Sequence, residues 1–216
     1  MRVKEIMKTA DEKKKVFLDA RQQSLKTLGN AFYGYLGFFA ARWYNKDCAM
    51  SVTAYGRFYI EQVISAAKEK GFTVLYSDTD SIFLHMEKKT EKDAHNFCES
   101  VNTKLPGMME LDYQGKYKRA LFVAMKETDS GAKKKYALID DKDKMTIKGF
   151  ETVRRNVSTI AKRTQEEVLR IVLRDNDPKK AFAYVQGVVN DLRAKNVETD
   201  DVSIPTHLTK GIDSYD

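Results

Sequence analysis

Two short apolar runs, Phe72–Tyr76 and Ser81–Met86, stand on either side of the polar residues Ser77 to Asp80. Runs of this length, rich in β-branched and aromatic residues and separated by turn-forming residues, are typical of strands joined in a β-hairpin. The strands of a hairpin are antiparallel. This part of the chain is therefore predicted to form an antiparallel sheet.

Helical patterns precede the hairpin. Asp11–Leu28 has the composition of a helix, and glycines Gly34 and Gly37 in the aromatic stretch that follows predict its end. Asp47–Lys70 reads as a long helix that Gly71 closes. Later elements are a helix over Glu91–Leu105, strands over Glu110–Lys126 and Tyr136–Gly149 around a lysine-rich loop, and helices over Val157–Arg174 and Pro178–Lys195 with a turn at Asp175–Asp177.

This mixture predicts an α+β fold, with a boundary near Arg154 where strands give way to helices. The 216 residues are 42% hydrophobic and include only three prolines, which argues against disorder. No run of about 18 apolar residues occurs, so we expect no membrane span. The polar, lysine-rich start is not a secretory signal, and two cysteines fifty residues apart favour a reducing, cytoplasmic location.

The positive charge is clustered. The net charge is +7, and the stretch from Tyr113 to Arg155 holds twelve Lys and Arg against six Asp and Glu. A clustered basic stretch suits a polyanion such as nucleic acid. On charge alone, a solvated surface face stays an equal alternative.

Asp78 and Asp80 are separated by one residue in the polar segment that joins the two predicted strands. Mg²⁺ prefers oxygen ligands and keeps several waters, so one or two carboxylates together with substrate phosphates can hold it. A hairpin between buried strands would fix these carboxylates in space. The alternative is an ordinary turn, since Asp and Ser are common turn formers.

Lys26, Asn30 and Tyr33 stand at positions i, i+4 and i+7 and would share one helix face. A cation, an amide and a phenol on one face could meet phosphate, sugar and base. The alternative is an amphipathic helix whose lysine extends along its surface. A third feature, the lysines Lys133 to Lys135 before Tyr136, could reach phosphates or form a solvated turn.

The three features in this order resemble family-B DNA polymerases, most closely the archaeal replicative enzymes. Lys-x-x-x-Asn-x-x-Tyr-Gly comes first, Tyr-x-Asp-Thr-Asp-Ser follows about fifty residues later, and Lys-Lys-Lys-Tyr comes last. The resemblance covers nearly the whole chain. Further matching segments are Tyr33–Tyr35, Ala41–Tyr44, Ser51–Ala54, Gly56–Arg57, Tyr117–Arg119, Lys148–Glu151 and Arg154–Arg155.

The resemblance implies three parts of a polymerase hand. Residues 1–33 would be a partial fingers domain, 34–150 the C-terminal part of the palm, and 151–216 a partial thumb. The implied fold is an antiparallel palm sheet with packed helices, flanked by a fingers helix and a mostly helical thumb.

The resemblance also implies roles for the site residues. Asp80 would be the direct metal ligand and catalytic residue, Asp78 a looser support, and Asp112, beside Glu110 on the next palm strand, an auxiliary acid. Lys26 would bind the incoming triphosphate, while Asn30 and Tyr33 would flank the nascent base pair. The residues expected to hold the primer–template duplex are Lys133, Lys134, Lys135, Tyr136, Arg154 and Arg155.

Two local departures from the family pattern occur. Ala31 stands where the family usually has Ser after the motif asparagine, which we expect to be tolerated because the neighbouring face is intact. Asn45 and Cys48 occupy the segment in which some archaeal relatives carry two cysteines, so no local disulfide bridge is expected there.

A larger departure is what the sequence lacks: no Asp-x-x-Ser-Leu-Tyr-Pro segment, the family's first palm carboxylate motif, occurs, and the exonuclease acids are absent. With Met1 a plausible natural start within the fingers, we expect the small subunit of a split DNA-directed DNA polymerase. A larger subunit would supply the N-terminal, exonuclease and first palm regions and the clamp contact. Two Mg²⁺ ions would be shared with that subunit, and the substrates would be dNTPs and primer–template DNA. The alternatives are a truncated polymerase, a non-catalytic DNA-binding accessory subunit, and an unrelated basic nucleic-acid-binding protein.

Overall fold

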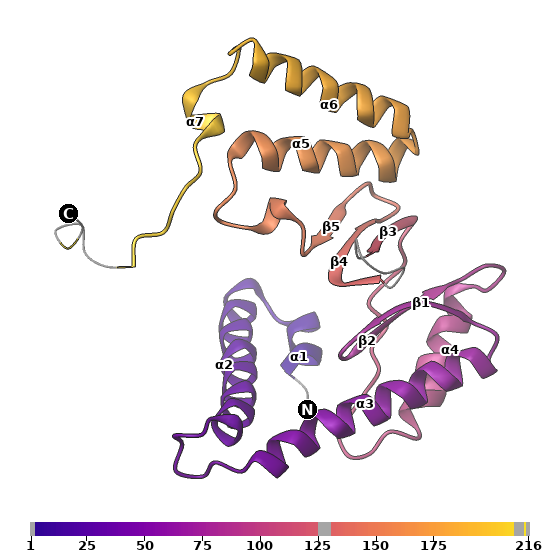
Figure 1. Cartoon of the computed structure of the whole chain (residues 1–216). Coiled ribbons are helices and arrows are strands. Elements are labelled where there is room, and N and C mark those ends of the chain that lie inside the picture. Colours follow the sequence, from indigo (N-terminus) through magenta and orange to yellow (C-terminus); the bar gives the residue numbers. More distant parts are fainter. Residues whose placement is uncertain (1–2, 125–130, 210–213, 215–216) are drawn as a thin grey trace. The chain divides into compact units, whose positions relative to one another are not determined.

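The computed structural model describes residues 3–124, 131–209 and 214 (Figure 1). These residues include helices and two small antiparallel sheets, which confirms the predicted α+β class. The elements are α1 (Val3–Thr9), α2 (Glu12–Gly37), α3 (Lys46–Glu69), β1 (Thr73–Asp78), β2 (Ser81–His85), α4 (Glu91–Asn102), β3 (Arg119–Ala124), β4 (Gly131–Ile139), β5 (Met145–Lys148), η1 (Glu151–Val153), α5 (Thr159–Arg170), η2 (Ile171–Asp175), α6 (Pro178–Arg193) and α7 (Thr199–Val202).

Backbone contacts divide the chain into two units. The N-terminal unit comprises residues 1–71 and 79–81, and the sheet–helix unit comprises residues 72–78 and 82–216. The division into fingers, palm and thumb uses different boundaries and stays a prediction. Among the described residues, no helix combines the length and apolar character that crossing a membrane requires.

Side-chain caps start both long helices of the N-terminal unit. The Asp11 carboxylate accepts a hydrogen bond from the Lys14 amide at 2.7 Å and begins α2, and Asn45 caps α3 in the same way. Helix α2 continues to Gly37, within the glycine-punctuated stretch where its end was expected. After α3 the chain passes through Gly71, whose φ of 73° is a left-handed conformation that suits glycine.

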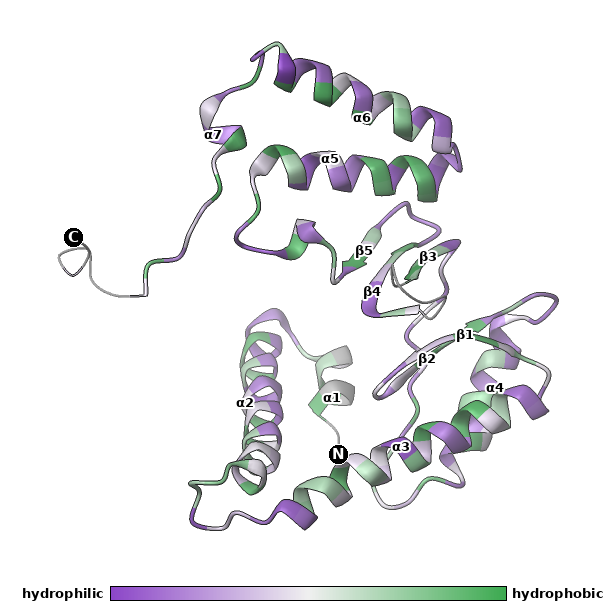
Figure 2. Cartoon of the chain, in the orientation of Figure 1, coloured by the Kyte–Doolittle hydropathy of each residue, from purple (hydrophilic) through white to green (hydrophobic). Residues whose placement is uncertain are grey.

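The N-terminal unit buries little apolar surface. Hydrophobic residues are interspersed with charged ones along α2 and α3 (Figure 2). Among its described residues, the buried hydrophobic side chains are Leu18, Ala49, Val63 and Ala67. The exposed large ones are Val16, Phe17, Leu25, Leu28, Phe32, Tyr33, Tyr35, Phe38, Phe39, Trp43, Tyr44, Met50, Val52, Tyr55 and Phe58.

The predicted hairpin is confirmed as β1 and β2. Ser77 and Asp78 belong to β1, so the turn is shorter than the four polar residues that the sequence indicated. In the sheet–helix unit, Phe72 before β1 packs on Phe97 of α4, with ring centroids 5.4 Å apart. Helix α4 begins in a capping box in which Thr90 and Asp93 bond each other's backbone amides.

A second sheet has the order β3-β4-β5, with both pairs antiparallel. The strand predicted from Glu110 begins only at Arg119, because the Asn102 side chain bonds both the amide and the carbonyl of Leu111. Those backbone groups are thereby satisfied without a strand partner. Glu110 and Asp112 therefore do not lie on a palm strand, and the part of the predicted strand at Met125 and Lys126 lies outside the described residues.

The single strand predicted over Tyr136–Gly149 is two strands. The Asp140 carboxylate accepts hydrogen bonds from the Lys142 and Lys144 amides, both at 2.9 Å, and this turn separates β4 from β5.

The sequence predicted that the lysine-rich segment is a loop ahead of the strand. This prediction is wrong, because Lys133 to Lys135 are part of β4. Phe122 pairs with Tyr136 but Ala124 pairs with Gly131, so two steps along β3 correspond to five along β4. Residues Ala132 to Lys135 thus form a bulge, which interrupts the regular alternation of side chains that marks a strand in a sequence.

The sheet carries a hydrophobic core. Helix α5 continues into the π-helical turn η2, and α5 lies beside α6 (Figure 1). The two amphipathic helices and the turn between them are thereby confirmed. The buried core residues are Ala137, Ile139, Phe150, Leu169 and Leu173, with Leu121, Val123, Met145 and Ile147 packed against them.

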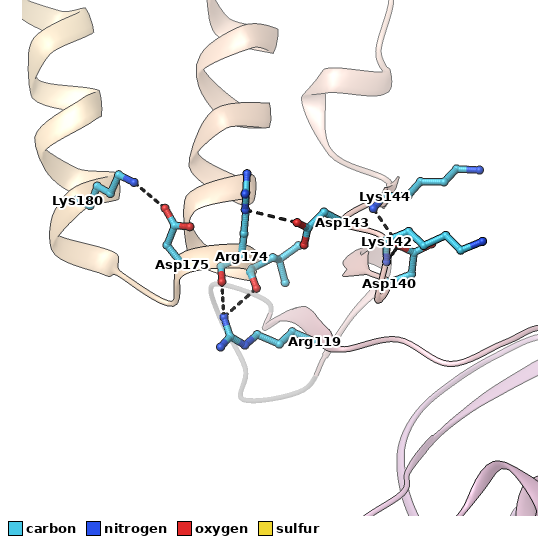
Figure 3. Close-up of polar contacts among 9 residues, drawn as sticks. Arg119, Asp140, Lys142, Asp143, Lys144, Arg174, Asp175 and Lys180 are labelled. Atoms are coloured by element: carbon cyan, nitrogen blue, oxygen red, sulfur yellow. Dashed lines mark hydrogen bonds and ion pairs between the residues drawn. The ribbon is translucent and has the colours of Figure 1, made fainter.

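Polar contacts fix the end of η2 to this sheet (Figure 3). The Arg119 guanidinium donates hydrogen bonds to the carbonyls of Leu173 and Arg174 at 3.0 and 2.8 Å. Arg174 in turn pairs with Asp143 at 3.6 Å. The carbonyls at a helix end lack partners within the helix, so an arginine from β3 suits them and joins helix to sheet.

Candidate active site

The hairpin presents two carboxylates at its turn. Asp78 is the last residue of β1 and is partly exposed, and Asp80 is exposed two residues later. Between them, Thr79 has a φ of 54°, a left-handed conformation that turns the chain. The local backbone thus brings two carboxylates to one turn, with oxygen donors of the kind that Mg²⁺ accepts.

The expected third acid, Asp112, lies in the irregular segment before β3, where it accepts a hydrogen bond from Gln114 at 3.1 Å. In the described part of the chain, no three His, Cys, Asp or Glu side chains gather in a way that could hold a metal ion. The role of Asp112 as an auxiliary ligand stays a prediction.

The proposed nucleotide face lies on α2. Lys26, Asn30 and Tyr33 all fall within this helix, and all three are exposed. The spacing of four and three residues places them along one side of the helix, as predicted.

Two contacts fix the backbone of the lysine bulge, the segment from Ala132 to Lys135. The Lys134 amide donates a hydrogen bond to the Tyr76 hydroxyl at 2.7 Å, and Lys134 has a φ of 59°. Gly149, at a φ of 69°, lies so close that a Cβ there would overlap the Lys134 carbonyl oxygen. Only glycine fits at this position without moving the bulge.

Lys135 meets a carboxylate. Its Nζ lies 3.3 Å from Oε1 of Glu151, and both side chains are about one-third exposed, at 31% and 35%. Gln165 of α5 donates a hydrogen bond to Oε2 of Glu151 at 2.7 Å and accepts one from the Thr152 amide at 3.0 Å. The Gln165 bond, a backbone bond and Lys135 together lower the pKa of Glu151 to about 2.

Tyr136 packs in an aromatic cluster between the two sheets. Its ring centroid lies 5.2 Å from that of Phe83 and 5.7 Å from that of Tyr76, and Phe122 completes the cluster. The remaining residues expected to bind DNA, Arg154 and Arg155, follow η1 and are exposed.

The model of DNA polymerase family B matches residues 1–216 of this sequence. The chain belongs to that family. A DNA polymerase of Thermococcus gorgonarius is 44% identical over 99% of this chain, and one of Methanocaldococcus jannaschii is 43% identical over 86%. The resemblance drawn from the motifs is thereby confirmed.

This family-B chain spans 27% of the length of the Thermococcus gorgonarius polymerase and 11% of the Methanocaldococcus jannaschii protein. The matched relatives therefore contain large regions with no counterpart here.

Sequence reasoning assigned no role to four residues around the bulge of this family-B polymerase chain: Tyr76, Gly149, Glu151 and Gln165. Gly149 between Lys148 and Phe150 was the available signal, since a lone glycine beside a strand often marks a close backbone approach. Gln165 gave no signal, because its contact with Glu151 arises only once α5 packs near η1.

Proposed function

We propose that this chain is the fingers, palm and thumb portion of a DNA-dependent DNA polymerase that adds dNTPs to a primer 3′ end. The observation that supports this most strongly is the acidic turn of Asp78 and Asp80 in a hairpin of a family-B chain. The proposed nucleotide face of Lys26, Asn30 and Tyr33 supports the same function.

Each part of the site has a role in phosphoryl transfer. Two Mg²⁺ ions, when bound, would activate the primer 3′-hydroxyl and neutralise the charge of the triphosphate. Asp80 would hold them directly and Asp78 would support the site. Lys26 pairs with the triphosphate, while Asn30 and Tyr33 orient the base pair, so the chain contributes mainly position and charge.

We further propose that a larger polypeptide completes the enzyme. The chain carries one of the two palm carboxylate motifs, and it spans only 27% of the length of the Thermococcus gorgonarius polymerase. The large hydrophobic side chains that α2 and α3 leave exposed support this, because an isolated unit seldom exposes so many unless a partner covers some of them. That polypeptide would supply the exonuclease region, the first carboxylate motif and the contact with a sliding clamp.

Reconstitution tests this proposal. The purified chain alone should extend no primer, and adding a polypeptide with the Asp-x-x-Ser-Leu-Tyr-Pro motif, identified by co-purification, should restore extension. Robust extension by the chain alone would contradict the need for a partner. Duplex binding without any extension in the reconstituted mixture would favour a non-catalytic accessory role.

A further inference from the structure

The three consecutive lysines of β4 have unequal surroundings. Lys133 and Lys134 are exposed, whereas Lys135 is partly buried against Glu151 and its Nζ lies 5.2 Å from the ring centroid of Phe150. In a regular strand Lys133 and Lys135 would share a face. The bulge and the positive φ of Lys134 end that equivalence, so neighbouring lysines enter different environments.

The partner of Lys135 is itself held in place. Glu151 accepts a hydrogen bond from Gln165, and Gln165 accepts one from the Thr152 amide, so the carboxylate is tied to both η1 and α5. Its pKa of about 2 keeps it ionised throughout the neutral range. A DNA phosphate that approached Lys135 would therefore meet a fixed negative charge that already neutralises this lysine.

We propose that Lys135 is a positioning residue that binds Glu151 and fastens the bulge to the η1–α5 corner, while Lys133 and Lys134 make the phosphate contacts of this strand. The second half of this inference rests on the proposed function. Lys135 acts through Lys134, whose amide is fixed by the Tyr76 hydroxyl and whose carbonyl packs on Gly149.

The two roles differ in their salt dependence. A lysine that neutralises a phosphate releases counterions, and each such contact adds roughly 0.9 to the slope of log K against log salt concentration. A lysine already neutralised by Glu151 releases none. Losing Lys135 should therefore weaken duplex binding equally at every salt concentration, by less than about fivefold, the limit for an ion pair worth at most ~1 kcal/mol.

The experiment measures binding of the full chain to a primer–template duplex by fluorescence anisotropy over a salt series. The variants are Lys133→Met, Lys134→Met and Lys135→Met, with Lys92→Met on α4 as the control for losing one exposed positive charge. Lys133→Met and Lys134→Met should each flatten the slope by roughly 0.9. Lys135→Met should leave the slope at the wild-type value, and equal flattening by all three variants would overturn the proposal.

A melting cycle tests the contact with Glu151 independently of DNA. Lys135→Met and Glu151→Gln should each lower the melting temperature, and the double variant should melt no lower than the worse single variant. Lys135→Arg should restore both melting and affinity. Additive melting shifts would overturn the positioning role.

The two tests separate this inference from the proposed function. If no lysine variant changed the slope of log K against log salt concentration, the proposal that this strand contacts the duplex would be wrong, together with the role given to Lys133 and Lys134. The melting cycle would still decide the role of Lys135.

Discussion

Among the described residues, the N-terminal unit buries four hydrophobic side chains and the sheet–helix unit buries thirteen. The first unit carries the proposed nucleotide face on an exposed helix. The second holds its lysine bulge between Tyr76, Gly149 and Glu151. The proposed functional side chains of the N-terminal unit are therefore exposed on a helix. Those of the sheet–helix unit are held by contacts with neighbouring residues.

This difference predicts two kinds of mutational response. Changes on exposed side chains, away from a core, usually alter stability by less than about 0.5 kcal/mol. Substitutions in the N-terminal unit should therefore reduce catalysis and leave unfolding nearly unchanged. Substitutions around the bulge should alter stability first, and DNA binding as a consequence.

Asp80→Ala should have the largest effect. It removes the carboxylate expected to bind metal directly, and it should lower the single-turnover rate of the reconstituted polymerase by roughly 10³-fold or more. Duplex affinity and the melting temperature should stay near wild type, because Asp80 is exposed. Asp78→Ala is the matched control and should do less damage. A near-normal rate for Asp80→Ala would show that the metal assignment is wrong.

Local elements were predicted from the sequence in both units, whereas the wrong predictions fall in the sheet–helix unit. The hairpin, both long helices and the paired helices at the C-terminal end were predicted, because caps, glycines and apolar periodicity are local signals. Asp80 lies in the hairpin turn as predicted, whereas Asp78 is the last residue of β1.

The bulge could not be predicted, because its cause is not local. Lys133 to Lys135 look like a solvated loop, yet they lie in a strand whose irregularity depends on Gly149 and Tyr76. The strand expected from Glu110 failed in the same way, since the Asn102 side chain replaces a strand partner at Leu111. Each of these contacts joins residues that are separated in the sequence and come together only in the folded chain.

Gly149→Ala should have the second-largest effect. The new Cβ would overlap the Lys134 carbonyl oxygen, and a φ of 69° strains any other residue. Overpacking and backbone strain together should cost about 2–4 kcal/mol of unfolding free energy, measured by urea denaturation. Gly107→Ala is the matched control: Gly107 has a φ of 60°, but a Cβ there meets nothing within 4 Å. Equal losses for the two variants would mean that the bulge can move away from the new side chain.

Lys26→Ala should have a smaller effect, and it should alter catalysis rather than stability. If Lys26 meets the triphosphate, its loss should lower kcat/KM for every dNTP by about 10- to 100-fold, the range for a hydrogen bond to a charged group. Duplex affinity and urea stability should not change, since Lys26 is exposed on α2. Lys14→Ala, a lysine near the start of the same helix, controls for loss of helix charge. A change in duplex affinity without a change in dNTP dependence would assign Lys26 to DNA.

The smallest effect concerns the pH dependence contributed by Glu151. Its pKa is lowered from 4.5 to about 2 by the bonds from Gln165, its own backbone and Lys135, so folding favours the ionised form. The resulting stabilisation is fully present above pH 4.5 and is lost as the pH falls toward 2. Glu151→Gln mimics the protonated acid. The gap in unfolding free energy between wild type and this variant should therefore be constant near neutral pH, at most ~1 kcal/mol for a partly exposed pair, and should close between pH 4.5 and 2. Urea denaturation at several pH values across this window measures the gap.

Glu166→Gln, which removes a carboxylate paired with Arg170 on the exposed side of α5, is the matched control and should show a smaller gap. A gap for Glu151→Gln that persisted at pH 2 would show that the side-chain amide disturbs packing at the η1–α5 corner, and that the charge of Glu151 is not what fastens the bulge.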